Sequence, residues 1–241
     1  MKMEINLQRT DIPSIHDALI LEALKLDTPL HEITHLYLDN SNLQNQKELD
    51  QLKHLPNLVT LSLTGLHINY KLINSLENTP NDTLKKLHCL YIDCTEIEDL
   101  SILRVCENLE LLHAQETPIT LFYTPSSNTS TLIELNLSDT KLTAITELET
   151  HTSIEKLILD VSMLYNKSLE FLDKYENLHT LSIICDDPEE NHGMLRNLKG
   201  PINLRHLYVP CDSLWYRMRD SILLRAYKNR NVTKEVFIDK S

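Results

Sequence analysis

The chain has few aromatic residues, few glycines and no excess of positive charge. These shortages limit the type of core it can form and the partners it can bind. Aromatic residues make up 5% of the 241 residues, and glycine occurs three times. The 41% hydrophobic content is therefore mostly leucine and isoleucine, which favours regular, layered packing. The formal net charge is −12. Because basic side chains supply most of the non-specific affinity for nucleic acid, we expect no nucleic-acid partner and no anionic-membrane partner.

Long apolar runs and paired cysteines are also missing. No run of about 18 consecutive apolar residues occurs, and the first residues hold no apolar stretch of signal-peptide length. The five cysteines are an odd number without CxxC spacing, which argues against a disulfide framework or a zinc site. We therefore expect a cytoplasmic chain in a reducing compartment, and a non-classical bacterial effector route of secretion remains an alternative.

Motifs that signal catalysis are absent as well. The sequence contains no GxGxxG, GxxxxGK[ST], GxSxG or HExxH motif. Catalysis needs a nucleophile, a base or a metal held in a pocket, and no pattern here points to one. We expect no enzymatic activity, no catalytic residue, no cofactor and no metal.

What the sequence does contain is an internal repeat. Residues 87–97 and 132–142 share the spacing LxxLxLxxTxL, and seven further segments follow the same spacing. The nine segments begin at residues 33, 58, 87, 109, 132, 154, 178, 204 and 233. A short L-x-L strand turns its apolar side chains to one face, and a single coil cannot bury that face alone. The coils must therefore stack, with their strands parallel along one surface.

This spacing resembles the leucine-rich repeat family over roughly residues 33–239. The resemblance implies an α/β fold: a right-handed solenoid with a parallel sheet on its concave side, helical or irregular segments on its convex side and capping helices at its ends. Family members often carry Asn at the ninth repeat position. This chain has Ser41, Leu66, Thr95, Thr117, Thr140 and Ser162 there. In this it is similar to the repeats of cytosolic phosphatase-regulatory proteins and of bacterial internalins, which have about 22 residues each.

Both ends of such a stack need covers, because a terminal coil leaves apolar surface and a strand edge in water. The segment from Ser14 to Asp17 resembles a capping box and predicts a helix over 12–27, with one apolar stripe. That stripe consists of Ile15, Ala18, Leu19, Ala23 and Leu26. Apolar residues at helical spacing, from Trp215 to Ala226, predict a second helix over 212–227, and a last strand is expected at 236–238.

We therefore interpret the chain as a single domain over 1–241. Its parts are an N-terminal helical cap at 1–32, repeats at 33–209, and a C-terminal helical cap with an edge strand at 210–241. On the convex side, residues 45–54 and 168–176 have the spacing of short helices. Residues 124–131 are turn formers throughout and predict an irregular connection.

Two cysteines fall beside a predicted strand. Cys89 is expected at an outward strand position, and Cys94 just after the strand, where leucine-rich repeats often pack a small residue inward. A reactive thiol needs a cationic neighbour that lowers its pKa. His88 is adjacent to Cys89 in sequence, but strand alternation turns it to the other side of the backbone.

The repeat also assigns the side chains that point outward from the sheet. The fifth position of LxxLxLxx stands outward at the centre of each strand, and the seventh shares its face. The predicted partner-binding residues are His35, Tyr37, Asp39, Tyr91, Asp93, His113, Gln115 and Tyr208. Tyr91 and His113 should touch, with Asp93 and Gln115 beside them. Tyrosines flanked by carboxylates suit a protein interface, and the acidic groups would select a basic segment of the partner.

These residues point to a scaffold or adaptor that binds a protein partner on its concave sheet. Two alternatives stay open: a regulatory subunit or activator of a phosphatase or GTPase, and a bacterial effector that acts on host proteins. A basic segment near the C-terminus offers a second candidate surface, formed by Arg217, Arg219, Arg225, Lys228 and Arg230. The sequence does not determine the oligomeric state.

Overall fold

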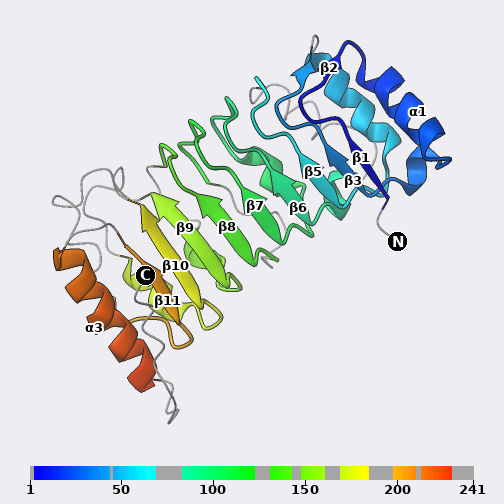
Figure 1. Ribbon diagram of the computed structural model, residues 1–241. Coiled ribbons are helices and arrows are strands. Elements are labelled where there is room, and N and C mark those ends of the chain that lie inside the picture. The colour runs from blue at the N-terminus through cyan, green and yellow to red at the C-terminus, as the bar shows by residue number, and fades with distance from the viewer. Residues whose placement is uncertain are drawn as a thin grey trace.

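The structure is a computed structural model of the whole chain. It describes residues 3–43, 46–68, 83–122, 131–142, 148–160, 169–184, 198–209 and 213–229. Within these ranges nine strands form one sheet, in which each strand pairs in parallel with the next (Figure 1). The strands, in sheet order, are β1 (Glu4–Asn6), β3 (His35–Tyr37), β5 (Thr60–Ser62), β6 (Cys89–Tyr91), β7 (Leu111–His113), β8 (Glu134–Leu137), β9 (Lys156–Asp160), β10 (Thr180–Ile184) and β11 (His206–Tyr208). A separate pair, β2 (Asp11–Ile12) and β4 (Asn42–Leu43), lies beside the first two coils.

One buried column of leucines runs through the stack. The fourth repeat positions pair in register from strand to strand, and each is at most 4% exposed. The column consists of Leu36, Leu61, Leu90, Leu112, Leu135, Leu157, Leu181 and Leu207. The prediction of a solenoid with these leucines as its core is confirmed.

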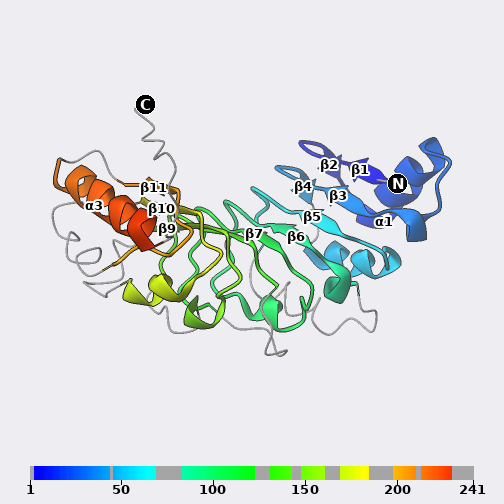
Figure 2. The same cartoon turned by 90° about the horizontal axis from the view of Figure 1, so that it is seen from below.

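The sheet lines the inner side of a curved array, and helical turns lie on the outer side (Figure 2). These turns are 3-10 helices: η1 (Leu30–Glu32), η2 (Gln46–His54), η3 (Leu84–Lys86), η4 (Ser101–Arg104), η5 (Leu148–Thr150) and η7 (Glu170–Lys174). The short helices predicted at 45–54 and 168–176 are thus 3-10 helices where the structure describes them. Nearly all of the irregular connection expected at 124–131 lies outside the described residues.

The N-terminal region differs from the helical cap that the sequence predicted. Residues 4–6 form β1, which pairs with β3 and places Ile5 beside Leu36 in the buried column. This first coil continues into α1 (Ile15–Lys25), which is shorter than the predicted 12–27. Ser14 caps α1 as expected, because its Oγ accepts a hydrogen bond from the Asp17 amide at 3.2 Å.

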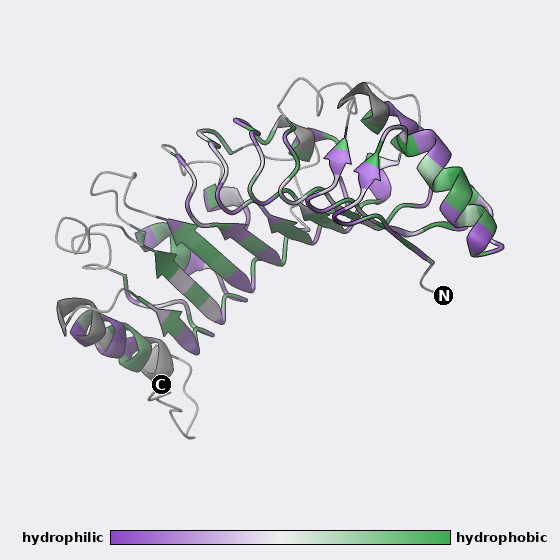
Figure 3. Cartoon of the chain, turned by 45° about the horizontal axis from the view of Figure 1, so that its top comes forward, coloured by the Kyte–Doolittle hydropathy of each residue, from purple (hydrophilic) through white to green (hydrophobic). Residues whose placement is uncertain are grey.

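The apolar stripe of α1 is only partly correct. Ile15, Leu19 and Ala23 are buried and Ala18 packs partly against the core, but Leu26 is 46% exposed. Leu26 follows the last helical residue, so it leaves the buried stripe. Hydrophobic and hydrophilic residues both occur along α1 (Figure 3), and Leu24 on its outer side is 72% exposed.

At the other end, α3 (Ser213–Asn229) packs beside β11. It matches the helix predicted over 212–227, and Ile222 is fully buried. The side chains of Trp215 and Ala226, which also supported that helix, lie outside the described residues, as does the strand expected at 236–238.

A left-handed turn follows each of the first six strands of the sheet. The eighth repeat position has a positive φ at Arg9, Asn40, Gly65, Cys94, Glu116 and Asp139. A Cβ on Gly65 would lie 2.2 Å from Asn40 Oδ1, so a larger residue there would require the Asn40 side chain to move. The inward packing expected for Cys94 is wrong: its φ of 55° turns the side chain outward, and it is exposed.

Threonine hydroxyls tie the strand ends to these turns. The Oγ1 atoms of Thr95 and Thr117 each donate to the carbonyl oxygen three residues earlier at 2.7 Å, and that of Thr140 does so at 3.0 Å. These three threonine hydroxyls at the ninth position therefore satisfy local backbone groups in the place where Asn is common.

Candidate functional site

The outward column of the N-terminal half brings the predicted aromatic residues onto one face. Tyr37, Ser62, Tyr91 and His113 occupy matching positions on β3, β5, β6 and β7. The rings of Tyr91 and His113 meet edge to face, with centroids 5.2 Å apart. The predicted contact between these two side chains is confirmed. Tyr37 lies two strands from Tyr91, with Ser62 between them.

Two carboxylates lie on the same face, two positions beyond the tyrosines. Asp39 accepts hydrogen bonds from Gln8 Nε2, from Ser62 Oγ and, at 3.2 Å, from the Thr64 amide. Asp93 accepts one from the Gln115 amide at 2.7 Å. Each carboxylate thus binds the backbone of the next coil, which fixes its position on the face.

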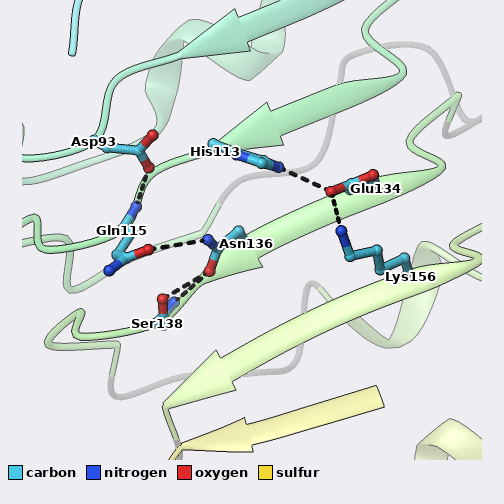
Figure 4. Close-up of polar contacts among 7 residues, drawn as sticks. All are labelled: Asp93, His113, Gln115, Glu134, Asn136, Ser138 and Lys156. Atoms are coloured by element: carbon cyan, nitrogen blue, oxygen red, sulfur yellow. Dashed lines mark hydrogen bonds and ion pairs between the residues drawn. The ribbon is translucent and has the colours of Figure 1, made fainter. Parts of the chain in front are cut away.

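The contact of Asp93 with Gln115 continues across the next strand (Figure 4). Gln115 Oε1 accepts from Asn136 Nδ2 at 3.4 Å, and Asn136 Oδ1 accepts from the Ser138 amide and hydroxyl at 3.1 and 2.8 Å. These polar side chains hold one another and the backbone, so the face is ordered before any partner binds.

Glu134 on β8 lies at the C-terminal boundary of this half of the face. Its Oε1 lies 3.0 Å from His113 Nε2 and 2.7 Å from Lys156 Nζ (Figure 4). Burial alone would raise the pKa of Glu134, but the hydrogen bonds from Lys156 and His113 outweigh burial and lower it. Glu134 therefore stays ionised and already has a cationic neighbour.

The pKa values of Asp93 and Tyr91 are raised, in contrast to that of Glu134. Burial, with added repulsion from Asp39 and Glu116, raises the pKa of Asp93, although the Gln115 amide and the nearby His113 oppose the shift. Burial also raises the pKa of Tyr91, so its phenol is neutral at physiological pH. Within the described residues, neither Asp39 nor Asp93 forms an ion pair with a lysine or arginine. A positive charge from outside would therefore stabilise this part of the face.

The same part of the sheet is hollowed. A cavity of about 670 Å³ lies on the face of the sheet over β1, β3, β5 and β6, and its lining includes Tyr37, Asp39 and Tyr91. Its other lining residues are Asn6, Gln8, Arg9, Asn40, Ser62 and Thr64. Asn6, Gln8 and Arg9 belong to the first coil, which the sequence analysis assigned to a helical cap. The spacing of Ile5, Leu7, Thr10 and Ile12 is the signal that could have identified them.

Most of the predicted partner-binding residues are thus gathered on β3, β6 and β7 and just after them. His35 lies at the start of β3 on the same face, where its Nδ1 is 2.8 Å from Thr34 Oγ1. Tyr208 is set apart: it is 55% exposed on β11, four strands beyond His113. At about 4.8 Å per strand, this separation is roughly 19 Å.

The basic C-terminal segment is less free than its sequence suggests. Arg219 Nη2 lies 2.9 Å from Asp220 Oδ1, and Arg225 Nε donates to the Ser221 carbonyl at 3.3 Å. Arg217 is exposed. The side chain of Lys228 and the whole of Arg230 lie outside the described residues.

The thiols beside the face lack the environment that activates a nucleophile. Burial raises the pKa of Cys89, and burial together with the nearby Glu116 carboxylate raises that of Cys94. In the described part of the chain, no group of three or more His, Cys, Asp or Glu side chains could hold a metal ion. No helix there is both long enough and apolar enough to span a bilayer.

Comparisons with known proteins show similarity of fold. No protein-family model matches the chain, and no curated protein matches it significantly. Among solved structures, internalin C2 of Listeria monocytogenes strain 4b F2365 superposes with a TM-score of 0.57 at 19% identity, over 86% of this chain and 78% of that one. An internalin F of the same strain gives 0.50 at 17% identity, over 86% and 67%. The plant peptide hormone receptor RGFR1 in complex with RGF2 gives 0.49 at 14% identity, over 87% of this chain and 30% of the receptor. Together with the nine-stranded parallel sheet and its leucine column, the two internalin superpositions establish that the chain has the fold of a leucine-rich repeat solenoid.

Proposed function

We propose that the chain is a cytoplasmic protein-interaction scaffold or adaptor without enzymatic activity, which binds a protein partner through the concave face over β1 to β7. One observation carries the proposal: a hollow on the described part of the sheet coincides with Tyr37 and Tyr91. Aromatic side chains held in a recess are typical anchors of protein interfaces, and the ordered polar groups around them form a rim.

The charges of this face favour a basic segment in the partner. Asp39 and Asp93 have neutral hydrogen-bond donors. Glu116 at the edge adds a third negative charge. In the lining of the hollow itself, Asp39 stands against the single cation Arg9. Complementary charge raises the rate of association and selects among partners.

The proposal is tested by isolating the partner from native extract and measuring its affinity for variants. Tyr91→Ala combined with His113→Ala should weaken binding at least tenfold, which is about 1.4 kcal/mol, and should barely change the melting temperature. Ser182→Ala, at the same repeat position on β10, is the matched control and should bind normally. If binding survives the double change but is lost when the charges of Arg217 and Arg219 are reversed, the interface is α3 instead.

The identity of the captured partner also separates the alternatives. A phosphatase or GTPase whose activity changes on binding would make the chain a regulatory subunit or activator. Capture of proteins from a host cell would make it a bacterial effector. A partner without enzymatic activity from the same cell supports an adaptor.

A further inference from the structure

A slot lies between two tyrosines on the concave face. Tyr37, Ser62 and Tyr91 are neighbours in register on three successive strands, so the strands of the tyrosines are about 9.6 Å apart. The ring of Tyr91 meets that of His113 edge to face, with centroids 5.2 Å apart. Ser62, the small residue between the two tyrosines, is itself only 4% exposed, and all three residues line the hollow.

We propose that this slot binds the guanidinium group of an arginine side chain from the partner, stacked between Tyr37 and Tyr91 and facing the carboxylates of Asp39 and Asp93. The proposal rests on the proposed function, because it names the group that the protein-binding face recognises.

The width of the slot suits a flat cation. A group midway between the two strands would lie about 4.8 Å from each strand, and a cation is attracted to an aromatic face within about 6 Å. Arginine is favoured over lysine because its planar guanidinium stacks on rings and can bind a carboxylate with two hydrogen bonds.

Hydrogen bonds already hold the two carboxylates in position for a guanidinium group. Asp39 is held beside the slot by Ser62, which forms its floor, and by Gln8 from the first coil. Asp93 follows β6 and is held by the Gln115 amide. The pKa of Asp93 is raised because burial and the neighbouring acids Asp39 and Glu116 disfavour its charge. A guanidinium group would relieve that repulsion. Asp39 and Arg9 are the charged residues that line the hollow itself, and Asp93 and Glu116 add negative charge beyond its lining.

The first experiment compares two small probes of the same shape. Nα-acetyl-arginine amide and its neutral analogue, Nα-acetyl-citrulline amide, are titrated into the full chain, and backbone amide shifts are followed by NMR. Saturable shifts centred on residues 37, 62 and 91, with at least tenfold weaker binding of citrulline, are expected. Equal binding of both probes, or arginine shifts spread over the whole surface, would overturn the proposal.

The second experiment fills the slot. Ser62→Leu places a branched side chain between the rings and should reduce arginine binding at least tenfold. Ser182→Leu makes the same change at the same repeat position on β10, away from the tyrosines, and should have no effect. Undiminished arginine binding by a folded Ser62→Leu chain contradicts the slot. If Ser62→Leu does not fold, Tyr37→Ala and Tyr91→Ala replace it: each removes one wall and should weaken arginine binding at least threefold, and full binding by both contradicts the proposal.

The two proposals can fail separately. If Tyr91 and His113 are needed for partner binding but arginine has no advantage over citrulline, the slot is wrong and the protein-binding face stands. If arginine binds selectively while the same two substitutions leave partner binding intact, the protein-binding face is wrong.

Discussion

Side chains on the concave face differ in whether they form hydrogen bonds to backbone groups. An outward repeat position predicts a side chain that only solvates the sheet. Asn136 is outward, opposite in direction to Leu135, yet it is 7% exposed because polar neighbours surround it. Its Oδ1 satisfies both the amide and the hydroxyl of Ser138, which is itself buried.

Asn136→Ala should therefore lower the free energy of unfolding by about 1–3 kcal/mol, because it leaves the buried Ser138 amide without its acceptor. Ser182→Ala, also outward, should change it by less than about 0.5 kcal/mol. Urea denaturation of both variants measures the difference. Equal, small effects would show that water replaces Asn136 at no cost.

His151 gives stability a dependence on pH. It is fully buried after η5, and its ring meets that of Phe122 at 5.1 Å. Burial lowers the pKa of His151 from 6.5 to about 4. The unfolded chain therefore binds a proton at a higher pH than the folded chain does. The free energy of unfolding is therefore not reduced by His151 above about pH 6.5, and it decreases as the pH falls from there toward about 4.

Between about pH 7.5 and pH 5, this residue should cost the wild-type chain about 2 kcal/mol of unfolding free energy. His151→Leu removes the titrating group and should flatten the pH dependence over that interval. The measurement is chemical denaturation of both chains at several pH values. The lowered pKa of Glu134 acts mainly below this interval, because the unfolded carboxylate, with an ordinary pKa of 4.5, begins to bind protons only near pH 5. Parallel pH profiles for the two chains would rule out His151 as the cause.

Among the elements, the strands follow from the sequence more closely than the segments between them. Alternation along each strand fixes which residues face inward, so the leucine column and the Tyr91–His113 contact could both be predicted. The strand β1 was missed because its repeat begins with Lys2, where an apolar residue is usual, and lies 31 residues before the next one at Ile33.

Contacts that depend on side-chain rotamers could not be predicted in the same way. Repeat spacing places Asp39 and Ser62 on one face, but it does not determine that they bond to each other, or that Gln8 joins them from the first coil. The type of helix on the convex side could not be predicted either. A pattern of helical spacing over 46–54 does not distinguish an α-helix from a 3-10 helix.

Leu135→Ala tests the packing of one strand in the middle of the stack. It removes a fully buried side chain between Leu112 and Leu157, and should lower the free energy of unfolding by about 2–5 kcal/mol. Leu24→Ala makes the same exchange at an exposed position of α1 and should have an effect below about 0.5 kcal/mol. Thermal and urea denaturation check both values. A loss at Leu24 as large as that at Leu135 would contradict this assignment of the core.

For the whole molecule, the order of the strands determines how stability is shared. Each of the nine strands pairs only with its immediate neighbours in the stack, and the sheet has no described pairing between distant coils. In such a quasi-one-dimensional fold, stability is approximately a sum over coils and the interfaces between them. A defect should therefore weaken the chain most where it lies and less with each coil further away.

Hydrogen exchange can follow that spread if Ile5→Ala is compared with Leu135→Ala. Ile5 lies in the terminal strand β1, so its loss should accelerate exchange in β1 and β3 and have little effect beyond β6. Leu135 lies in β8, so its loss should accelerate exchange on both sides, most strongly in β7 and β9 and less toward each end. A gradual decline in both directions is expected if residues 1–241 form one solenoid domain. A sharp boundary, with one half accelerated and the other unchanged, would instead show two separately folding units and refute the single domain predicted from the repeat.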